Sequence, residues 1–463
     1  MPSRQDQLHS YQFMVQRVVA ALVLRETDPA QSPFRRAAGT ALASVLIAAI
    51  ALGAVVVYGV LVGGGATGWR DAQAVIVEKE SGARYVYRDG RLHPVLNYAS
   101  ALLIVGGSEQ RSVLVSRASL AGVARGAPLG IPDAPDSLPA PDRLSRAPWT
   151  VCSVTPDGGR AGPRSVLLVG RPVQDGRVLA DDAVLGRHPD GNLYLVWRQQ
   201  RHLLRDPDLV LAALAWTSER PVPLAPALLN SLPAGADLGP VRIPEQGRPS
   251  VRVPGARIGE VFVVTGQGGG RQYAVALRNG LAGITQVQAD LLLTGGAGRD
   301  RPTPMTQRTF AALPKLPDLV PVDAAAPPAT RPSLVAPGAA VCASVADDGG
   351  VREVRVAAVV PEAEGAGRVA VGSPAGPVRA DQVLVEPGRG AVVEAVAAPG
   401  ATGGAVFVVT DLGRRYAVTD PAVLGMLGYG AVRPMRLPAG VVALVPAGGA
   451  LDPAVAREPV RPA

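Results

Sequence analysis

The sequence predicts an α+β, β-rich protein in which a single transmembrane helix leads into an elongated extracytoplasmic body. Three observations lead to this fold class: a long uncharged apolar run near the amino end, an aromatic content of 4% beside 54 Gly and 44 Pro, and hairpin-like segments that recur along the chain. With so few aromatic residues, the core must be packed with Val, Leu and Ala, and frequent Gly and Pro suit short strands joined by turns. We therefore expect four hairpin-helix repeats around a central β domain with pseudo-two-fold symmetry.

The apolar run predicts one membrane span. Residues 37–69 carry no charge. Within them, residues 41–62 are long enough to cross a hydrocarbon core of about 30 Å as one helix. A transmembrane helix is expected over residues 37–66. A cleaved secretory signal is the alternative, but the run exceeds the roughly 7 to 15 apolar residues of such signals and the leader before it is long.

The residues that flank the run predict its orientation. Arg35 and Arg36 lie immediately before it, and three more arginines precede them. Beyond it, Arg70 and Lys79 lie among acidic residues. Because basic residues favour the cytoplasmic side, the N-terminus is expected in the cytoplasm and the body outside the plasma membrane.

The cytosolic segment, residues 1–36, is predicted to be an amphipathic helix and a linker. Apolar residues recur at helical spacing over residues 5–25, and Pro29 and Pro33 separate this stretch from the span. The apolar face must be buried against a protein partner or the membrane surface. Its polar face carries few basic residues, so a protein partner is favoured over the lipid surface.

The two cysteines, Cys152 and Cys342, both lie in the body. An even count in an oxidising compartment predicts one disulfide between them, and two buried free thiols are the alternative. The bridge would close a loop of about 190 residues, which stabilises by at most about 5 kcal/mol on the chain-entropy model.

Four segments share a strand, a tight turn and a second strand: residues 74–87, 192–204, 260–275 and 405–418. In each, alternating β-branched and aromatic residues flank a polar turn, which is the pattern of a β-hairpin. A short helical candidate follows each hairpin. The predicted repeats are residues 70–130, 192–240, 255–315 and 405–455.

The cysteine segments indicate a larger duplication. VCSVTPDGG at residues 151–159 resembles VCASVADDGG at residues 341–350, and each lies between two hairpin segments. The central β domain is therefore expected to consist of residues 144–191 and 333–404, with the repeats in pairs at its two ends. The alternative is that the hairpins are generic features of a Val- and Gly-rich chain, which would make the matching cysteine spacings a coincidence.

The charge pattern does not predict nucleic-acid binding. The formal net charge is +8, but the basic residues are nearly all Arg and are scattered among acids. The abundance of Arg, Ala, Gly, Pro and Val is typical of a GC-rich genome. Without a basic run or an aromatic ladder, a solvated surface explains the charge.

No catalytic or metal-binding constellation is predicted, and no cofactor. The four histidines, at positions 9, 93, 188 and 202, lack metal-ligand spacing. The glycine-rich stretch at residues 266–272 lacks the Lys-Ser/Thr ending of a phosphate-binding loop and is interpreted as a hairpin turn. The acidic pairs at residues 181–182 and 347–348 are interpreted as turn and edge residues and not as a catalytic dyad, because adjacent residues on a strand point to opposite faces.

The chain resembles the EccB family over residues 5–455. The resemblance rests on DQLHSYQFMVQRVVAALV, GWRDAQAVIVEKESGARYVYRDGRLHPVLNYASALLIVG, GIPDAPDSLP, WTVCSV and RRYAVTDPAVLGMLGYG, together with the single span near the amino end. Members of this family are membrane-anchored subunits of actinobacterial type VII (ESX) secretion systems. One departure is the second repeat, where Trp197-Arg198-Gln199 replaces a glycine-bearing turn.

The resemblance implies a structural core subunit of a secretion machine in the plasma membrane. Its implied partners are an FtsK/SpoIIIE-type ATPase, a polytopic channel subunit, further membrane subunits and other copies of itself. Some family members are labelled ATPases, so an extracytoplasmic nucleotide hydrolase is an alternative, although no Walker A motif is present. A peptidoglycan-binding envelope anchor is a third possibility.

Overall fold

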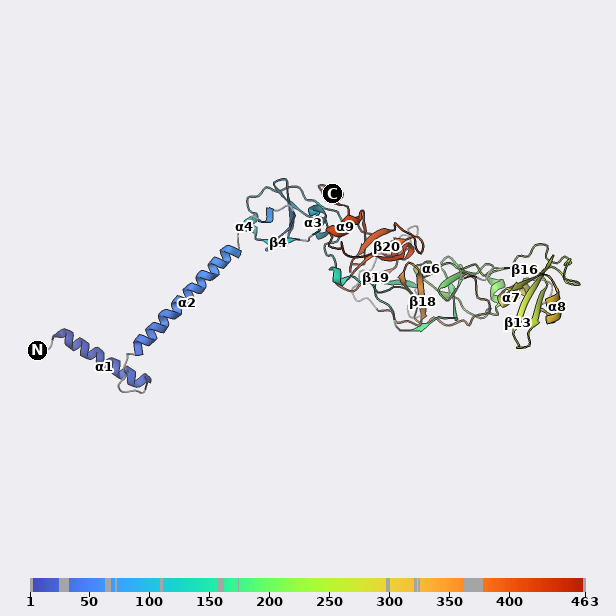
Figure 1. Ribbon diagram of the computed structural model, residues 1–463, viewed down its shortest axis with the longest axis horizontal. Helices are drawn as coiled ribbons and strands as arrows, with labels where there is room; N and C mark the ends of the chain where they lie inside the picture. The colour runs from blue at the N-terminus through green and yellow to red at the C-terminus, as the bar shows by residue number, and fades with distance from the viewer. Residues whose placement is uncertain are drawn as a thin grey trace.

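The computed structural model describes residues 3–24, 33–62, 68–70, 73–108, 111–155, 162–173, 175–296, 300–319, 323, 325–361 and 378–460. Two helices at the amino end precede a long body of small β-sheets (Figure 1). The protein is thus mixed α+β and rich in strands, as the sequence predicts.

The first two helices are the segments expected in the cytoplasm and in the membrane. Helix α1 spans Arg4–Leu24 and helix α2 spans Pro33–Val62. Apolar side chains of α1, among them Leu8, Tyr11 and Phe13, are exposed. Within α2, Gly39–Val57 is long and apolar enough to cross a membrane, and it is the one such stretch among the described residues. The helix begins before the predicted residues 37–66, and residues 63–66 lie outside the described part of the chain.

Four small sheets have closely related strand orders. In each, three consecutive strands form an antiparallel meander, and a later strand pairs in parallel with the first of the three. The first sheet has the order β3-β2-β1-β4, the second β10-β9-β8-β11, the third β15-β12-β13-β14-β16 and the fourth β22-β21-β20-β23.

The strands of the first two sheets are β1 Val75–Glu78, β2 Arg84–Arg88, β3 Arg91–Pro94, β4 Ser112–Val115, β8 Ala183–Arg187, β9 Leu193–Trp197, β10 Gln200–Leu203 and β11 Val222–Pro223. Those of the last two are β12 Val261–Thr265, β13 Arg271–Leu277, β14 Gly280–Ile284, β15 Thr303–Met305, β16 Lys315–Leu316, β20 Ala391–Val396, β21 Ala405–Val409, β22 Arg415–Val418 and β23 Met435–Pro438.

Each meander is followed by a helix that begins at a capping side chain. Asn97, Asp206, Thr285 and Asp420 accept hydrogen bonds from the first turns of α3 Tyr98–Val105, α5 Pro207–Ala213, α7 Gln286–Thr294 and α9 Pro421–Met426. Such caps satisfy amide groups that a helix start leaves without partners. The parallel fourth strand is then followed by α4 Arg117–Leu120, α6 Pro226–Ser231, α8 Gln307–Ala312 or α10 Ala439–Val442.

A six-stranded central sheet joins residues from both predicted central segments. Its order is β19-β6-β5-β17-β18-β7. The strands are β5 Trp149–Val154, β6 Arg164–Leu168, β7 Arg177–Val178, β17 Ala340–Asp347, β18 Gly350–Val356 and β19 Gln382–Leu384. Short helices η1 Gly68–Arg70 and η2 Pro141–Arg143 lie before the first sheet and before β5.

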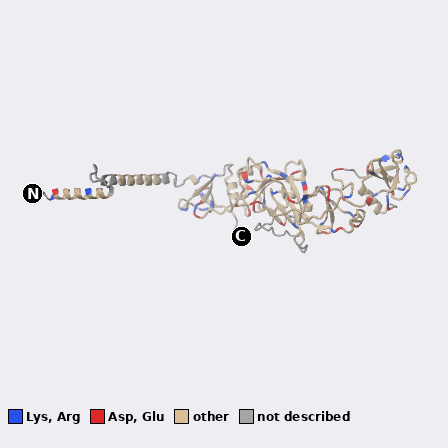
Figure 2. Cartoon of the chain, turned by 90° about the horizontal axis from the view of Figure 1, so that it is seen from below, with Lys and Arg blue, Asp and Glu red and all other residues tan. Residues whose placement is uncertain are grey.

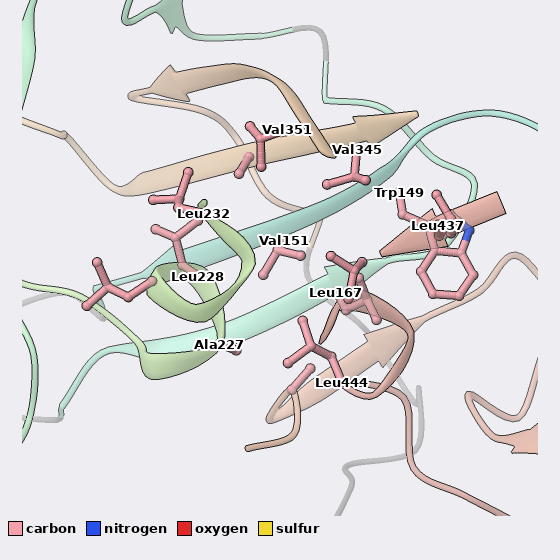
Figure 3. Close-up of a cluster of buried hydrophobic side chains, with 14 of the residues drawn as sticks. Trp149, Val151, Leu167, Ala227, Leu228, Leu232, Val345, Val351, Leu437 and Leu444 are labelled. Carbon is pink, nitrogen blue, oxygen red and sulfur yellow. The ribbon is translucent and has the colours of Figure 1, made fainter. Parts of the chain in front are cut away.

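The largest core covers one face of the central sheet. Trp149 and Val151 of β5 and Val345 of β17 lie on this face because side chains along a strand alternate. Helices α6 and α10 cover them with Leu228, Val441 and Val442, and Leu232 and Leu444, just after these helices, complete the cover. Figure 3 shows α6 lying across these strands.

The small sheets pack in two pairs. Helix α3 of the first sheet contacts α9 of the fourth and α11 Pro453–Ala456, and one core joins both sheets. Helix α5 of the second sheet contacts α7 of the third. In Figure 1 the first pair lies next to α2 and the third sheet, in yellow, lies at the far end.

Two strands have partners outside the ranges predicted for the central domain. Strands β8 and β20 fall within residues 144–191 and 333–404, but they pair with β9 and β21. The hairpins at residues 192–204 and 405–418 are therefore the second and third strands of their sheets, whereas those at 74–87 and 260–275 are the first and second. Alternation predicts a strand but does not specify its neighbour, which explains the difference.

Candidate functional site: the disulfide-bearing central sheet

A disulfide joins the two predicted cysteines at the middle of the central sheet. Cys152 on β5 and Cys342 on β17 are directly opposite each other in an antiparallel pair, and the structure bonds them. Both side chains are buried. The bond therefore connects two segments that are separated by 190 residues in the sequence.

The cysteines lie on the face opposite the large core. Val166, Leu168 and Val173 pack around them, together with Ala340 and Ala358. Two pairs further along the same strands, the hydroxyl oxygens of Thr150 and Ser344 are 3.2 Å apart and buried. These neighbours exclude water from the disulfide, so this site is suited to holding strands together and not to thiol exchange.

A polar contact also ties the two segments together. The Asp381 carboxylate accepts hydrogen bonds from the amide and the hydroxyl of Ser165, at 2.7 and 2.6 Å. The Ser165 hydroxyl in turn accepts from the Asp381 amide at 2.9 Å. This contact holds β19 beside β6. Neither residue is predicted from the sequence, because β6 and β19 meet only in the folded chain. Hydrogen bonds to an ionised carboxylate are among the stronger kinds.

The acidic pairs form separate ion pairs with arginines. Asp181 contacts Arg198 at 3.0 Å, and Asp348 contacts Arg436 at 3.2 Å. Asp182 pairs with Arg177 and Asp347 with Arg352. The hydrogen bond from Arg352 lowers the pKa of Asp347, so this carboxylate is ionised. A catalytic dyad would need two carboxylates sharing one proton, and these arrangements do not provide that.

The glycine-rich stretch is the turn between β12 and β13. The amide of Gly266 donates to the carbonyl of Gly270 at 2.9 Å, and the amide of Gly269 donates to the carbonyl of Gly266 at 3.0 Å. Gly269 has φ +79°, which explains a glycine there. These amides close a hairpin instead of pointing together at a phosphate.

The histidines lie on separate elements. His93 and His202 donate through Nδ1 to the carbonyls of Ala127 and Ala236, at 2.9 and 2.8 Å. The Nδ1 atom of His188 is 2.8 Å from the Asp190 carboxylate, and His9 is in α1. The described residues contain no group of three side chains that could hold a metal ion.

Among the residues that the structure describes, acidic and basic positions are interspersed along the body (Figure 2). The features together define a β-rich, disulfide-bonded protein with one helix of membrane-spanning length in the described part of the chain.

The chain belongs to the EccB family. The family model described as "Type VII secretion system ESX-1, transport TM domain B" matches residues 1–459. The ESX-2 secretion system ATPase EccB2 of Mycobacterium tuberculosis is 32% identical over 68% of this chain, and the match covers 64% of that relative's length. The ESX-3 secretion system ATPase EccB3 of Mycolicibacterium smegmatis is 30% identical over 96% of this chain and 88% of its own length.

Solved structures share the fold. A chain of an intact ESX-5 inner membrane complex superposes with a TM-score of 0.70 at 26% identity, covering 100% of this chain and 96% of that one. A chain of an EccB3 dimer from an ESX-3 core complex gives a TM-score of 0.66 at 28% identity, covering 83% of this chain and 100% of that one.

Proposed function

We propose that this protein is a structural core subunit of a type VII secretion machine in the plasma membrane. The observation that carries the proposal is the likeness, over the whole chain, to a chain of an ESX-5 inner membrane complex. The elongated, cross-linked body supports a role in organising a complex, because it offers a long surface at a fixed geometry.

We further propose that the body consists of four repeats arranged with pseudo-two-fold symmetry. The shared meander, helix, parallel strand and second helix of the four small sheets support the repeats. The order of the central sheet supports the symmetry, because β5 and β17 lie at the centre, β6 and β18 flank them, and β19 and β7 form the edges. The Cys152–Cys342 bond would then lie on the axis.

The proposed topology has α1 in the cytoplasm and the body outside it. The arginines before α2 support this orientation, and so does a disulfide in the body, since such bonds persist in oxidising compartments. The exposed apolar side chains of α1 would pack on a cytosolic partner. By resemblance, the partners are an FtsK/SpoIIIE-type ATPase, a polytopic channel subunit and further membrane subunits.

Self-association is part of the same proposal. The EccB3 dimer of the ESX-3 core complex supports contacts between copies of this chain. The test is purification of the tagged full-length chain in mild detergent, followed by mass spectrometry of the proteins that accompany it. We expect an FtsK-type ATPase and a polytopic membrane protein. Recovery of the chain alone would count against the proposal.

The second candidate function is nucleotide hydrolysis, which is favoured by the word ATPase in the names of the relatives. The nominated loop is testable because Gly268 has open space around it, so a valine fits there without disturbing the fold. We expect phosphate release by the full-length chain to stay at background, both in the wild type and in Gly268→Val. If the wild type releases phosphate and Gly268→Val does not, the protein is a hydrolase and this expectation is overturned.

A further inference from the structure

A cavity of about 420 Å³ lies in the third sheet, between α8 and the loop that precedes β12. Its apolar floor is buried or half-buried and includes Phe262, Met305 and Leu313. Its rim is exposed and includes Gly255 of the loop and Ala312 of α8. The third sheet is at the end of the body farthest from α2, so the cavity opens away from the span (Figure 1).

The first sheet shows what fills the corresponding space. Ile76 of β1 and Phe262 of β12 hold the same position in the strand pairings of their sheets. In the first sheet, Trp69 from the segment before β1 packs in one cluster with Ile76 and is 1% exposed. Its ring meets that of Tyr87 edge to face, with the centroids 5.5 Å apart. In the third sheet, Ala276 takes the place of Tyr87, and the loop before β12 has no aromatic residue.

The wall formed by the parallel strand corresponds as well. Val115 and Met305 each come directly before the capping residue of α4 or α8. Val115 belongs to the cluster around Trp69, and Met305 lines the cavity. Thioether groups and aromatic rings such as that of Phe262 both make favourable contacts with aromatic side chains. The space that an indole fills in the first sheet is therefore suited to an aromatic side chain in the third.

One wall of the cavity carries a charge that the first sheet lacks. Glu260 lies two residues before Phe262, where the first sheet has Ala74. Its carboxylate accepts hydrogen bonds from the Thr303 hydroxyl at 2.9 Å and the Arg257 amide at 3.2 Å. A carboxylate has about four acceptor positions, so it also has the capacity to accept from an indole N–H or a basic side chain.

We infer that this cavity is a docking site for a partner protein that inserts an aromatic side chain with an Arg or Lys beside it. The chain itself contains such a pair, since Arg70 follows Trp69 and its guanidinium lies 5.3 Å from the centre of the indole ring. The extracytoplasmic location of the partner rests on the proposed function, whereas the fit of the side chain to the cavity does not.

Titration of the full-length chain in mild detergent with a short peptide tests the inference. The probe is acetyl-Gly-Trp-Arg-amide, the sequence of residues 68–70, made with fluorotryptophan so that fluorine NMR reports the peptide alone. We expect saturable binding with half-saturation below about 1 mM. The Gly-Trp-Glu peptide should bind at least about fivefold more weakly because it lacks the basic side chain. The Gly-Ala-Arg peptide should not compete.

Three variants locate the site. Ala312→Trp fills the cavity with its own indole, so binding should be lost. Ala311→Trp is the matched control, because Ala311 is an exposed neighbour on α8 outside the cavity, and it should bind like the wild type. Glu260→Gln should weaken binding of Gly-Trp-Arg about fivefold and should not weaken that of Gly-Trp-Glu.

Three results would each overturn the inference: no saturable binding by the folded wild-type chain, equal binding by the two tryptophan variants, or equal affinity for the Arg and Glu peptides. Partition of the peptide into the micelle is the same for every variant and does not saturate. None of these outcomes depends on the secretion role, which the purification described above tests separately.

Discussion

The central sheet and the small sheets that flank it are held together in different ways. The central sheet joins strands from two distant parts of the chain, and a buried disulfide and the Asp381–Ser165 contact fix them. Each small sheet is formed by a continuous stretch, and close packing of a ring against a glycine occurs in three of them. In the central sheet, a covalent bond and a charged contact offset the entropy of closing a long loop, which grows with the separation of the segments.

The small sheets differ in the side chains that pack at one equivalent position. A Cβ at Gly126, Gly235 or Gly448 would overlap the ring of His93, His202 or Tyr416. In the third sheet the sizes are reversed, since the small Ala282 on β14 pairs with the large Leu316 on β16.

His93 and His202, the two histidines that pack against a glycine, differ in their surroundings. His93 is half-buried, whereas His202 is fully buried and its Nε2 atom has no hydrogen-bond partner. Burial lowers the pKa of His202, and the carbonyl of Ala236 and the charge of Asp237 oppose this only in part. His202 is thus held neutral in the folded protein.

Removing the disulfide should have the largest effect. We expect replacement of both Cys152 and Cys342 by Ala to lower the free energy of unfolding by about 2–5 kcal/mol, because the unfolded chain gains freedom. Guanidinium titration of the full-length chain, followed by tryptophan emission, measures this, since Trp69, Trp149 and Trp216 are buried in the folded protein. Non-reducing mass spectrometry of the wild type should show one peptide pair joined through these cysteines. Two alkylatable thiols there would contradict the account.

Crowding the ring of His202 should have the next largest effect on the free energy of unfolding. Gly235→Ala places a Cβ against the ring of His202 and the side chain of Gln200, so we expect a loss of about 1–3 kcal/mol. Gly126→Ala should cost less, since His93 is half-buried and can move. The control, Gly268→Ala, meets open space and should be near neutral. Equal losses of unfolding free energy at all three positions would show that packing of the ring against the glycine does not determine stability.

The smallest effect should be a dependence of stability on pH. His202 has a lowered folded-state pKa, so the unfolded chain binds its proton more readily than the folded one. The contribution of neutral His202 to the free energy of unfolding is fully present above the pKa of the unfolded chain, about 6.5. It is lost as the pH falls towards the pKa of the folded protein, by at most about 1.4 kcal/mol per pH unit. The His202→Tyr variant, which copies Tyr416, should lose this part of the slope. An unchanged slope would exclude His202 as its source.

The sequence predicted features that depend on composition and spacing. The uncharged residues 37–69 predicted the long helix α2, and paired spacings around Cys152 and Cys342 predicted which strands meet. The sequence did not predict that β8 and β20 join the small sheets, because alternation of side chains is the same in any β-sheet. The Asp381–Ser165 contact was not predicted either, since it depends on segments that meet only after folding.

The central claim, that this protein is a structural subunit and works in a large assembly, is tested most directly by native mass. The measurement is mass photometry of the tagged full-length chain purified in mild detergent. We predict a complex many times the 47.5 kDa of the chain, with several copies of it and of other membrane proteins. A well-folded species with the mass of a single chain in its detergent micelle would contradict the account.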